Sequence, residues 1–382
     1  MTVERLGLKW VKVDLNAWES NLTWIKKRVA PAELMPVIKA NAYGHGSLKM
    51  AQACEKMGLK WLVVATLREA IELRRGFVNS RILVLGATPE SQISDLINYR
   101  VTATVCDVEY AIALNEQAKR VGQKIKVHVY IDTGMGRMGQ APEELAELVK
   151  ALSKCDSLEM EGLYSHFAVS DELDPDSEEF TRQQWQRLSE CFNNLEVKPP
   201  LLHISNSGGV MNYSYPWGNA VRPGLICYGI APGELREKDS SLKKVMSLHC
   251  RPLYIKKMKK GESVGYGRLF KLEKDTTILT LPVGYADGVP RRIARELYVS
   301  IKGKPYPVVG RICMDMMMVD LGQDEIDLKA DVTLLGEDGP TIEQWSEWSD
   351  TIPYEIMTSI GRRWGYLYTR GTKIDEVVLS EA

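Results

Sequence analysis

The sequence predicts an α/β protein in which an N-terminal (β/α)8 barrel of the TIM type is followed by a mostly β C-terminal domain. Three observations lead to this prediction. Apolar or alternating runs alternate with helix-like segments through roughly the first 230 residues, as expected for parallel strands joined by crossover helices. Eight such runs follow one another, more than an open doubly wound sheet usually contains. After about residue 240, β-type runs are joined by turns with little helix.

The eight predicted barrel strands occupy residues 33–39, 61–66, 81–86, 101–106, 125–132, 158–165, 200–206 and 219–223. Helices are expected between them, among others at residues 47–56, 142–154 and 178–192. The barrel is expected over residues 12–240 and the β-rich domain over residues 241–382. A further alternating run at residues 8–15 can pair with either domain, so residues 1–11 are a candidate addition to the second.

Composition places the chain among ordinary globular proteins. Its 382 residues exceed the ~250–300 at which one core stops growing, so two domains are expected. The net charge of −1 gives no reason to expect a nucleic-acid or membrane partner, and no apolar stretch reaches the ~18 residues of a membrane span. Seven cysteines without a CxxC pair predict reduced thiols in the cytoplasm. The five histidines show no metal-ligand spacing, so no metal site is expected.

The first predicted strand ends in a cation, Lys39, within the stretch ELMPVIKANAYGHG. A salt-bridged or snorkelling lysine is one interpretation, and an amine held for chemistry is the other. Enzymes with this barrel build their sites at the carboxyl ends of the strands. Other chemically capable residues stand at or just after the ends of later strands: Arg137, His166, Ser207, Arg222 and Gly224.

Each of these residues also has a purely structural interpretation. Arg137 can form an ion pair in its loop, His166 can be a hydrogen-bonded core histidine, and Ser207 can cap a helix. Their common position at one rim favours a binding site instead. The loops after strands seven and eight usually cradle phosphate in this architecture, and Ser207 with the amides near Gly224 and Leu225 would supply neutral donors. A rim lysine beside a phosphate cradle suggests pyridoxal phosphate bound as an imine.

The chain resembles the alanine racemases, fold-type III pyridoxal-phosphate enzymes, over almost its whole length. The matching stretches are PVIKANAYGHG (36–46), DTGMGRMG (132–139), SHF (165–167), NS (206–207), VRPGL (221–225), VGYGRLF (264–270), VGYADG (283–288) and GRICMD (310–315). The lysine segment in combination with GYADG and CMD is specific. The resemblance implies a homodimer in which the β domain of the partner subunit completes each active site.

The resemblance also implies roles for individual residues. Lys39 would carry the cofactor and act as one acid/base, and Tyr266 would be the second, reaching from the partner chain. Arg222 would face the pyridine nitrogen. The residues expected to bind the cofactor's phosphate are Tyr43, Ser207, Gly224 and Leu225.

The substrate carboxylate would contact Arg137 and the backbone of Met314. His166, also a cofactor contact, would support Tyr266 together with Arg291. Tyr285, Cys313 and Asp315 are expected in supporting positions. Two bases are needed because a racemase must remove the α-proton on one face and return it on the other.

Alanine racemase activity, supplying D-alanine for peptidoglycan precursors, is the leading hypothesis. A serine or broad-specificity racemase on the same scaffold is the alternative. A decarboxylase of the same cofactor class would place an acidic residue at the pyridine nitrogen, and Arg222 argues against it. A non-catalytic pyridoxal-phosphate binder would resemble the barrel alone, so the second domain argues against that class.

Two positions depart from the family pattern. Many members carry a carbamylated lysine where this chain has Tyr130, so Arg137 must be held by a bound anion such as chloride or by the phenol itself. Some members also carry a phosphate-binding, substrate-gating tyrosine where this chain has Arg362. This second departure weakens the inference that the substrate pocket selects alanine.

Overall fold

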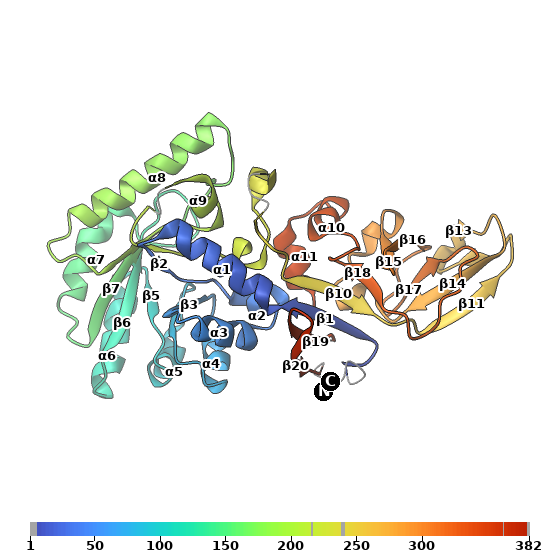
Figure 1. The fold of residues 1–382 in the computed structure, drawn as a ribbon. Coiled ribbons are helices and arrows are strands. Elements are labelled where there is room, and N and C mark those ends of the chain that lie inside the picture. Colours follow the sequence, from blue (N-terminus) through green and yellow to red (C-terminus); the bar gives the residue numbers. More distant parts are fainter. Residues whose placement is uncertain (1–5, 215–216, 238–240, 362, 380–382) are drawn as a thin grey trace. The chain divides into compact units, whose positions relative to one another are not determined.

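The structure, a computed structural model, describes residues 6–214, 217–237, 241–361 and 363–379 (Figure 1). The chain forms two compact units. The barrel unit comprises residues 18–42 and 47–243, and the β unit comprises residues 1–17, 43–46 and 244–382. No helix in the described ranges is long and apolar enough to cross a membrane.

The barrel unit contains eight parallel strands that close on themselves. In chain order they are β2 (Glu33–Leu34), β3 (Trp61–Val64), β4 (Arg81–Val84), β5 (Ala103–Val105), β6 (Ile125–Tyr130), β7 (Leu158–Tyr164), β8 (Leu201–His203) and β9 (Ala220–Val221). Six form one sheet in the order β2-β9-β8-β7-β6-β5, and β3 pairs with β4. Parallel bridges from Val37 to Val63 and from Leu83 to Thr102 join the two sheets into a barrel. The predicted α/β fold class is confirmed.

The first helix precedes the barrel strands, and the others follow them as expected for crossover connections (Figure 1). They are α1 (Leu15–Val29), α2 (Lys39–Gly44), α3 (Ser47–Lys56), α4 (Leu67–Arg75), α5 (Ile93–Asn98), α6 (Val108–Arg120), α7 (Leu145–Leu152), α8 (Pro175–Asn193) and α9 (Ser207–Asn212). The helix predicted at residues 178–192 starts three residues earlier, because Asp174 caps it and Pro175 occupies its first position.

The first barrel strand is shorter than the sequence predicts. Strand β2 ends at Leu34, although the Met35 amide still donates to the Val221 carbonyl at 2.9 Å and a parallel bridge forms at Val37. Lys39 therefore does not close a strand; it is the first residue of α2. Pro36 explains the interruption, because a proline has no amide hydrogen for a strand ladder.

The β unit is built on a ten-stranded sheet in the order β11-β14-β17-β16-β15-β18-β10-β1-β19-β20. Its strands are β1 (Lys9–Asp14), β10 (Met246–Cys250), β11 (Tyr254–Met258), β14 (Thr276–Leu281), β15 (Tyr298–Ile301), β16 (Lys304–Val309), β17 (Met317–Asp320), β18 (Val332–Leu335), β19 (Gly365–Arg370) and β20 (Lys373–Val378). A hairpin of β12 (Ser263–Val264) and β13 (Phe270–Lys271) and helices α10 (Ile342–Trp348) and α11 (Pro353–Ser359) complete it. Strand β1 lies between β10 and β19, so the run at residues 8–15 pairs with this unit.

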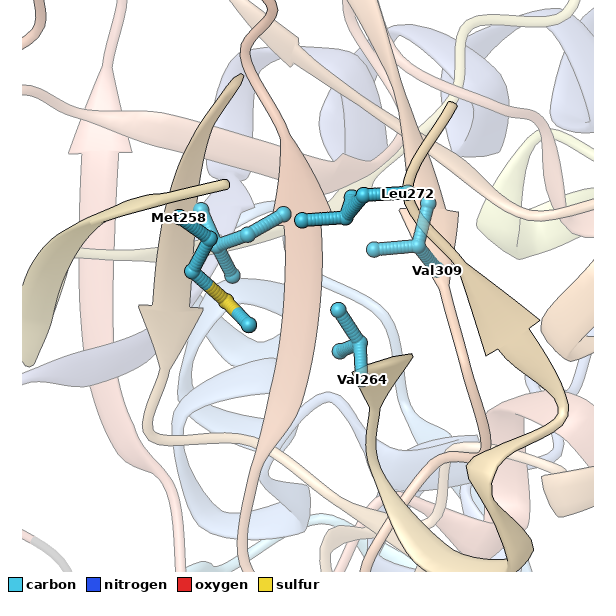
Figure 2. Packing of buried hydrophobic residues seen from close by; sticks show 5 residues of the cluster. Met258, Val264, Leu272 and Val309 are labelled. Atoms are coloured by element: carbon cyan, nitrogen blue, oxygen red, sulfur yellow. The ribbon is translucent and has the colours of Figure 1, made fainter. Parts of the chain in front are cut away.

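A small apolar core lies under the β12–β13 hairpin (Figure 2). It contains Met258, Val264, Leu272, Ile278 and Val309, each less than 10% exposed. Phe270 and Met318 pack against it from the edge. Because burial of each such side chain contributes ~1.5–3 kcal/mol, this core fixes the hairpin that leads into the segment of Tyr266.

Candidate active site

Lys39 lies at the start of a left-handed turn. The four residues that follow it, Ala40 to Tyr43, all have φ between 51° and 53°. A left-handed conformation costs a non-glycine residue about 1–2 kcal/mol, so four in succession are a strained arrangement that the surroundings must hold in place. Strain of this kind is concentrated at functional sites.

Hydrogen bonds within the barrel unit hold the first part of this turn. The Ala42 amide donates to the Ile38 carbonyl at 2.9 Å, and the Ser47 amide donates to the Asn41 side chain at 2.9 Å. The carboxylate of Glu69 accepts the Ala40 amide at 2.6 Å. Glu69 also closes the capping box of α4, so the turn is attached to a rigid helix start.

The environment of Lys39 favours a neutral amine. Burial lowers the pKa of Lys39, and the positive charge of Arg137 lowers it further, while Glu69 acts in the opposite direction. An unprotonated amine is what attack on an aldehyde requires, so the electrostatics suit a lysine that forms a covalent bond.

Arg222 is a buried cation at the same end of the barrel, only 2% exposed. Its Nη1 contacts Nδ1 of His203 and donates to the His203 carbonyl at 3.2 Å. Its Nη2 donates to the Ser165 carbonyl at 2.6 Å and lies 3.3 Å from Nδ1 of His166. Within the described ranges no carboxylate forms an ion pair with Arg222, and burial lowers its pKa to about 10.

Aromatic rings fix the plane of this guanidinium. The Arg222 Cζ lies 4.8 Å from the centre of the Tyr164 ring, where cation–π attraction operates. The Tyr164 ring stacks in turn on His203, with centres 4.9 Å apart, and on Tyr130, with centres 4.6 Å apart. The guanidinium therefore has one orientation.

One nitrogen of the Arg222 guanidinium takes no part in these contacts. Its Nε is buried and has no hydrogen-bond partner among the described residues. A buried N–H without an acceptor is costly, which indicates that a bound molecule supplies the acceptor. The pyridine nitrogen of pyridoxal phosphate, when unprotonated, is such an acceptor, so Arg222 fits this cofactor.

A second feature fits the phosphate end of the cofactor. Ser207, the first residue of α9, accepts the Gly224 amide at 3.0 Å and the Ile226 amide at 3.4 Å through its hydroxyl. The cap of α9 is Asn206, so the helix-cap interpretation of Ser207 is wrong. The structure thus brings Ser207 together with the 224–226 loop, where the sequence predicts a cradle of neutral donors.

His166 and Arg137 also lie in the barrel unit, and fewer contacts to other described residues hold them than hold Arg222. Burial lowers the pKa of His166 well below its ordinary value, and the charges of Arg222, Arg137 and Lys39 act in the same direction. Arg137 is exposed, and no hydrogen bond or ion pair joins it to another described residue. The loop-ion-pair interpretation of Arg137 is therefore wrong for the described part of the chain.

Tyr130 does not hold Arg137. Its ring is buried, at 2% exposure, and its hydroxyl has no hydrogen-bond partner among the described residues. The expectation that the phenol itself positions Arg137 is therefore not met, because no bond between them forms. The ring instead packs on Tyr164 within the aromatic stack beneath Arg222.

The remaining predicted residues belong to the β unit. Tyr266 begins a short 3₁₀ turn, Tyr266–Arg268, between two glycines with positive φ, and its side chain is 69% exposed. Arg291 is exposed at the start of another short turn, Arg291–Arg295. Tyr43 is 5% exposed, and its ring lies 5.9 Å from that of Tyr354.

Backbone bonds join the GYADG and CMD segments within this unit. The Tyr285 amide donates to the Cys313 carbonyl and the Ala286 amide to the Met314 carbonyl, both at 3.0 Å. A β-carbon on Gly284 would lie 2.3 Å from both carbonyl oxygens, so only glycine permits this approach. Asp315 forms an ion pair with Arg363 at 2.8 Å. Arg362 lies outside the described residues.

Three residues that hold Arg222 are not among those predicted from the sequence: His203 contacts it directly, and His128 and Glu161 act through His203. All three are buried, on β6, β7 and β8. The sequence does contain a signal for them, because each is a polar side chain within a strand run that otherwise supplies apolar residues to the barrel interior. A strand pattern alone does not reveal that their side chains meet.

Comparison with known proteins identifies the family. Residues 13–232 match the description "Alanine racemase, N-terminal domain", and residues 245–368 match "Alanine racemase, C-terminal domain". The chain is 39% identical over 375 residues to "Alanine racemase 2" of Caldanaerobacter subterraneus subsp. tengcongensis, and 37% identical over 378 residues to the alanine racemase of Clostridium kluyveri. Both alignments cover 96% of each chain.

Solved structures of alanine racemases have the same fold as this chain. The alanine racemase of Clostridium difficile 630 superimposes with a TM-score of 0.92 at 34% identity, covering 100% of both chains. The enzyme of Bartonella henselae with covalently bound pyridoxal phosphate gives a TM-score of 0.84 at 28% identity, covering 95% of this chain and 100% of that one. With two domain matches in order and full-length relatives above 30% identity, this chain belongs to the alanine racemase family.

Proposed function

We propose that this protein is an alanine racemase that binds pyridoxal phosphate at the carboxyl end of its barrel and interconverts L- and D-alanine. Full-length similarity to alanine racemases supports the reaction. The observation that carries the site is the buried Nε of Arg222, which has no acceptor among the described residues.

The barrel unit offers a contact for each end of the cofactor. Lys39 would bond it covalently, Arg222 would donate to its ring nitrogen, and Ser207 with the amides of Gly224 and Leu225 would hold its phosphate. Tyr43 and His166 are the further contacts that we propose. When bound, the cofactor delocalises the electrons left on the α-carbon as the amino acid loses its proton, which no protein side chain can do.

Arg222 also restricts the chemistry. An arginine does not readily give up a proton, so a ring nitrogen that accepts from it stays unprotonated. Electron withdrawal is weaker as a result, which suits simple proton exchange better than decarboxylation. The neighbours of Arg222 are neutral, because burial holds the pKa of both His166 and His203 well below the ordinary value.

Two bases would carry the proton. We propose Lys39 on one face and, on the other, the partner's Tyr266 within a homodimer. The 69% exposure of Tyr266 on a glycine-flanked turn supports a role outside its own subunit, because an aromatic side chain held out in this way is available to a partner. Arg291 and His166 would help to position this tyrosine. Tyr285, Cys313 and Asp315 would occupy further supporting positions around it.

The substrate would be anchored through its carboxylate. Arg137 has no partner among the described residues and is free to bind an anion, and the backbone of Met314 would be the second contact. A racemase that prefers serine or accepts several amino acids remains the alternative, because Arg362 replaces a tyrosine that some relatives carry near the substrate. We further propose that D-alanine is made for peptidoglycan precursors.

A chiral assay of the purified protein with added pyridoxal phosphate tests the proposal. L-Alanine should give D-alanine faster than L-serine gives D-serine, and no carbon dioxide should be released. Lys39→Ala should lose the visible absorbance of the bound cofactor and all activity. Faster conversion of serine would favour the alternative, and release of carbon dioxide in step with substrate loss would reject racemisation.

Tyr266→Phe tests the second base. This variant should keep the visible absorbance but lose activity by at least about 100-fold, the usual contribution of a general acid/base. It should also slow solvent exchange of the α-proton more for one enantiomer than for the other. Equal and normal exchange of both enantiomers would exclude Tyr266.

A further inference from the structure

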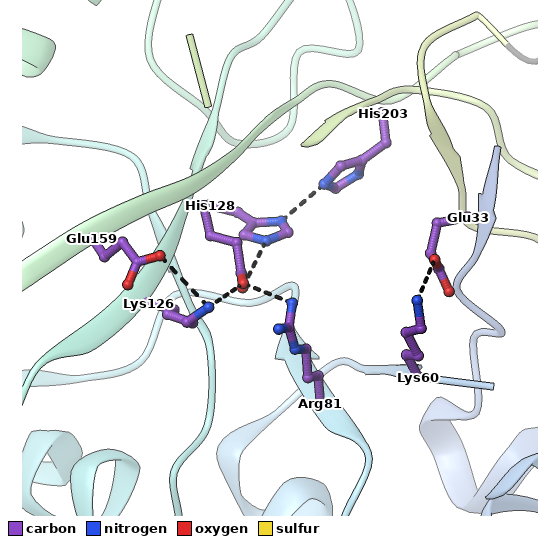
Figure 3. Close-up of polar contacts among 8 residues, drawn as sticks. Glu33, Lys60, Arg81, Lys126, His128, Glu159 and His203 are labelled. Carbon is purple, nitrogen blue, oxygen red and sulfur yellow. Dashed lines mark hydrogen bonds and ion pairs between the residues drawn. The ribbon is translucent and has the colours of Figure 1, made fainter. Parts of the chain in front are cut away.

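A chain of four polar side chains runs through the interior of the barrel unit, from Arg222 to Glu161. Figure 3 shows its two histidines, His203 and His128. Arg222 contacts Nδ1 of His203, and Nε2 of His203 lies 2.9 Å from Nδ1 of His128. Nε2 of His128 then faces Oε2 of Glu161 at 3.7 Å. All four residues are at most 2% exposed.

The two ends of this chain fix the direction of its hydrogen bonds. Arginine has only donors, so Nδ1 of His203 must be an acceptor without a hydrogen. The hydrogen of His203 is then on Nε2 and is donated to Nδ1 of His128. That leaves the hydrogen of His128 on Nε2, pointing at a carboxylate, which can only accept.

The opposite direction makes two contacts repulsive. With hydrogens on the Nδ1 atoms, His203 would direct an N–H at the guanidinium of Arg222, and His128 would direct a lone pair at the Glu161 carboxylate. Both contacts are repulsive and buried, where neither can be relieved by water. Nε2 of His128 and Oε2 of Glu161 have no hydrogen-bond partner among the described residues, and they face each other at 3.7 Å as an electrostatic contact.

Two cationic side chains hold Glu161, the end of the chain that is farthest from Arg222. Oε1 of Glu161 accepts Lys126 Nζ at 2.6 Å and Arg81 Nη1 at 2.9 Å, which leaves Oε2 facing His128. Burial raises the pKa of Glu161, but the bonds from His128 and Lys126 outweigh this and lower it overall. Burial lowers the pKa of His128, and burial and the Arg222 charge lower that of His203, so both rings are neutral near pH 7.

We propose that Glu161 is a positioning residue for the cofactor site: through His128 it sets the tautomer that makes His203 an acceptor for Arg222, and so keeps the free Nε–H of Arg222 in place for the cofactor's ring nitrogen. This inference rests on the proposed function. Glu161 lies on β7, which pairs with β6, and the imidazole rings of His128 and His203 separate it from the Arg222 guanidinium.

The first test uses the wild-type protein without cofactor. Nitrogen-15 NMR of histidine-labelled protein distinguishes a ring nitrogen that bears a hydrogen from one that does not, and the chain has only five histidines to assign. His128 and His203 should both be neutral with the hydrogen on Nε2 at pH 7. A hydrogen on Nδ1 of either ring, or a charged ring, would overturn the proposal without any variant.

The second test compares Glu161→Gln with Glu159→Gln. Glu159 lies on the same strand and pairs with the same Lys126, at 3.6 Å, but does not contact a histidine (Figure 3). A glutamine at 161 can donate to Nε2 of His128, so the tautomers of His128 and His203 should reverse or become mixed. The Glu159→Gln protein should keep the wild-type nitrogen signals.

Binding and kinetics complete the test. For Glu161→Gln we expect pyridoxal-phosphate affinity and kcat to fall about tenfold, with KM for alanine unchanged. Loss of a residue that hydrogen-bonds to a metal ligand, and so orients it, has an effect of this size. Glu159→Gln should match the wild type. Unchanged tautomers and affinity in Glu161→Gln would overturn the role of Glu161. A wild-type protein with the expected tautomers but no cofactor binding would instead refute the proposed function.

Discussion

Tyr368 lies directly against Gly46: a β-carbon at residue 46 would be 1.8 Å from the Tyr368 hydroxyl. That hydroxyl donates to the His45 carbonyl at 3.0 Å, and Tyr366 donates to the Gly44 carbonyl at 3.1 Å. Two neighbouring tyrosines of β19 therefore hold the end of the lysine-bearing turn. The glycines of YGHG are needed because Met357 and Tyr368, in the same unit, lie against their backbone: a β-carbon on Gly44 would be 2.3 Å from the Met357 carbonyl oxygen.

Gly46→Ala should destabilise the β unit by about 2–5 kcal/mol, the sum of a left-handed alanine and an overpacked contact. Gly261→Ala is the matched control, because Gly261 has a similar φ, +89° against +91°, but nothing within 4 Å of its β-carbon. The control should cost only about 1–2 kcal/mol in urea unfolding. Equal losses would show that the contact with Tyr368 is unimportant, and adding Tyr368→Phe to Gly46→Ala should restore part of the loss.

Lys39 should react as an amine at lower pH than an ordinary lysine, because burial and Arg137 lower its pKa. In cofactor-free protein, the pH dependence of labelling by an amine-directed reagent, read by peptide mass spectrometry, should have its midpoint for Lys39 below about 10.4, the ordinary lysine value. Arg137→Gln should move the midpoint upward. A midpoint at or above the ordinary value would contradict the electrostatic description.

Acid should destabilise the protein in the range where histidine titrates. Burial lowers the pKa of His128, His166, His203 and His249, so each binds a proton more readily when unfolded. Stability is then complete above the unfolded value of about 6.5 and is lost as pH falls below it, by up to about 1.4 kcal/mol per pH unit for each histidine. Urea unfolding between pH 8 and pH 5 measures the slope, and a flat profile would exclude neutral histidines in the core.

Tyr130→Phe should leave activity intact and stabilise the barrel unit slightly. The Tyr130 hydroxyl is buried and makes no hydrogen bond among the described residues, so its removal relieves a desolvation cost of about 1 kcal/mol while the stacking on Tyr164 is kept. Thermal unfolding and the KM for alanine provide the measurements. A large rise in KM would mean that the hydroxyl acts on Arg137, directly or through a bound anion.

The sequence predicts the architecture well because periodicity and turn residues are local signals. The eight barrel strands, the helix at residues 47–56 and the β-rich second half can all be read from the spacing of apolar residues. Barrel geometry also predicts that Lys39, Ser207 and Arg222 lie near strand ends, while their roles toward a cofactor, which the family motifs imply, stay predictions. The predicted first strand is too long because Pro36, which cannot donate to a strand ladder, ends it after Leu34.

Other features depended on contacts between distant segments. Residues 43–46 stand early in the chain, soon after the first barrel strand, but their packing against Tyr366 and Tyr368 places them in the β unit. His128, Glu161 and His203 stand 33 to 75 positions apart and meet only because adjacent strands set their register. Composition and motif fix which side chains are available, whereas the direction of a buried hydrogen bond depends on both of its ends, and only the folded chain brings those ends together.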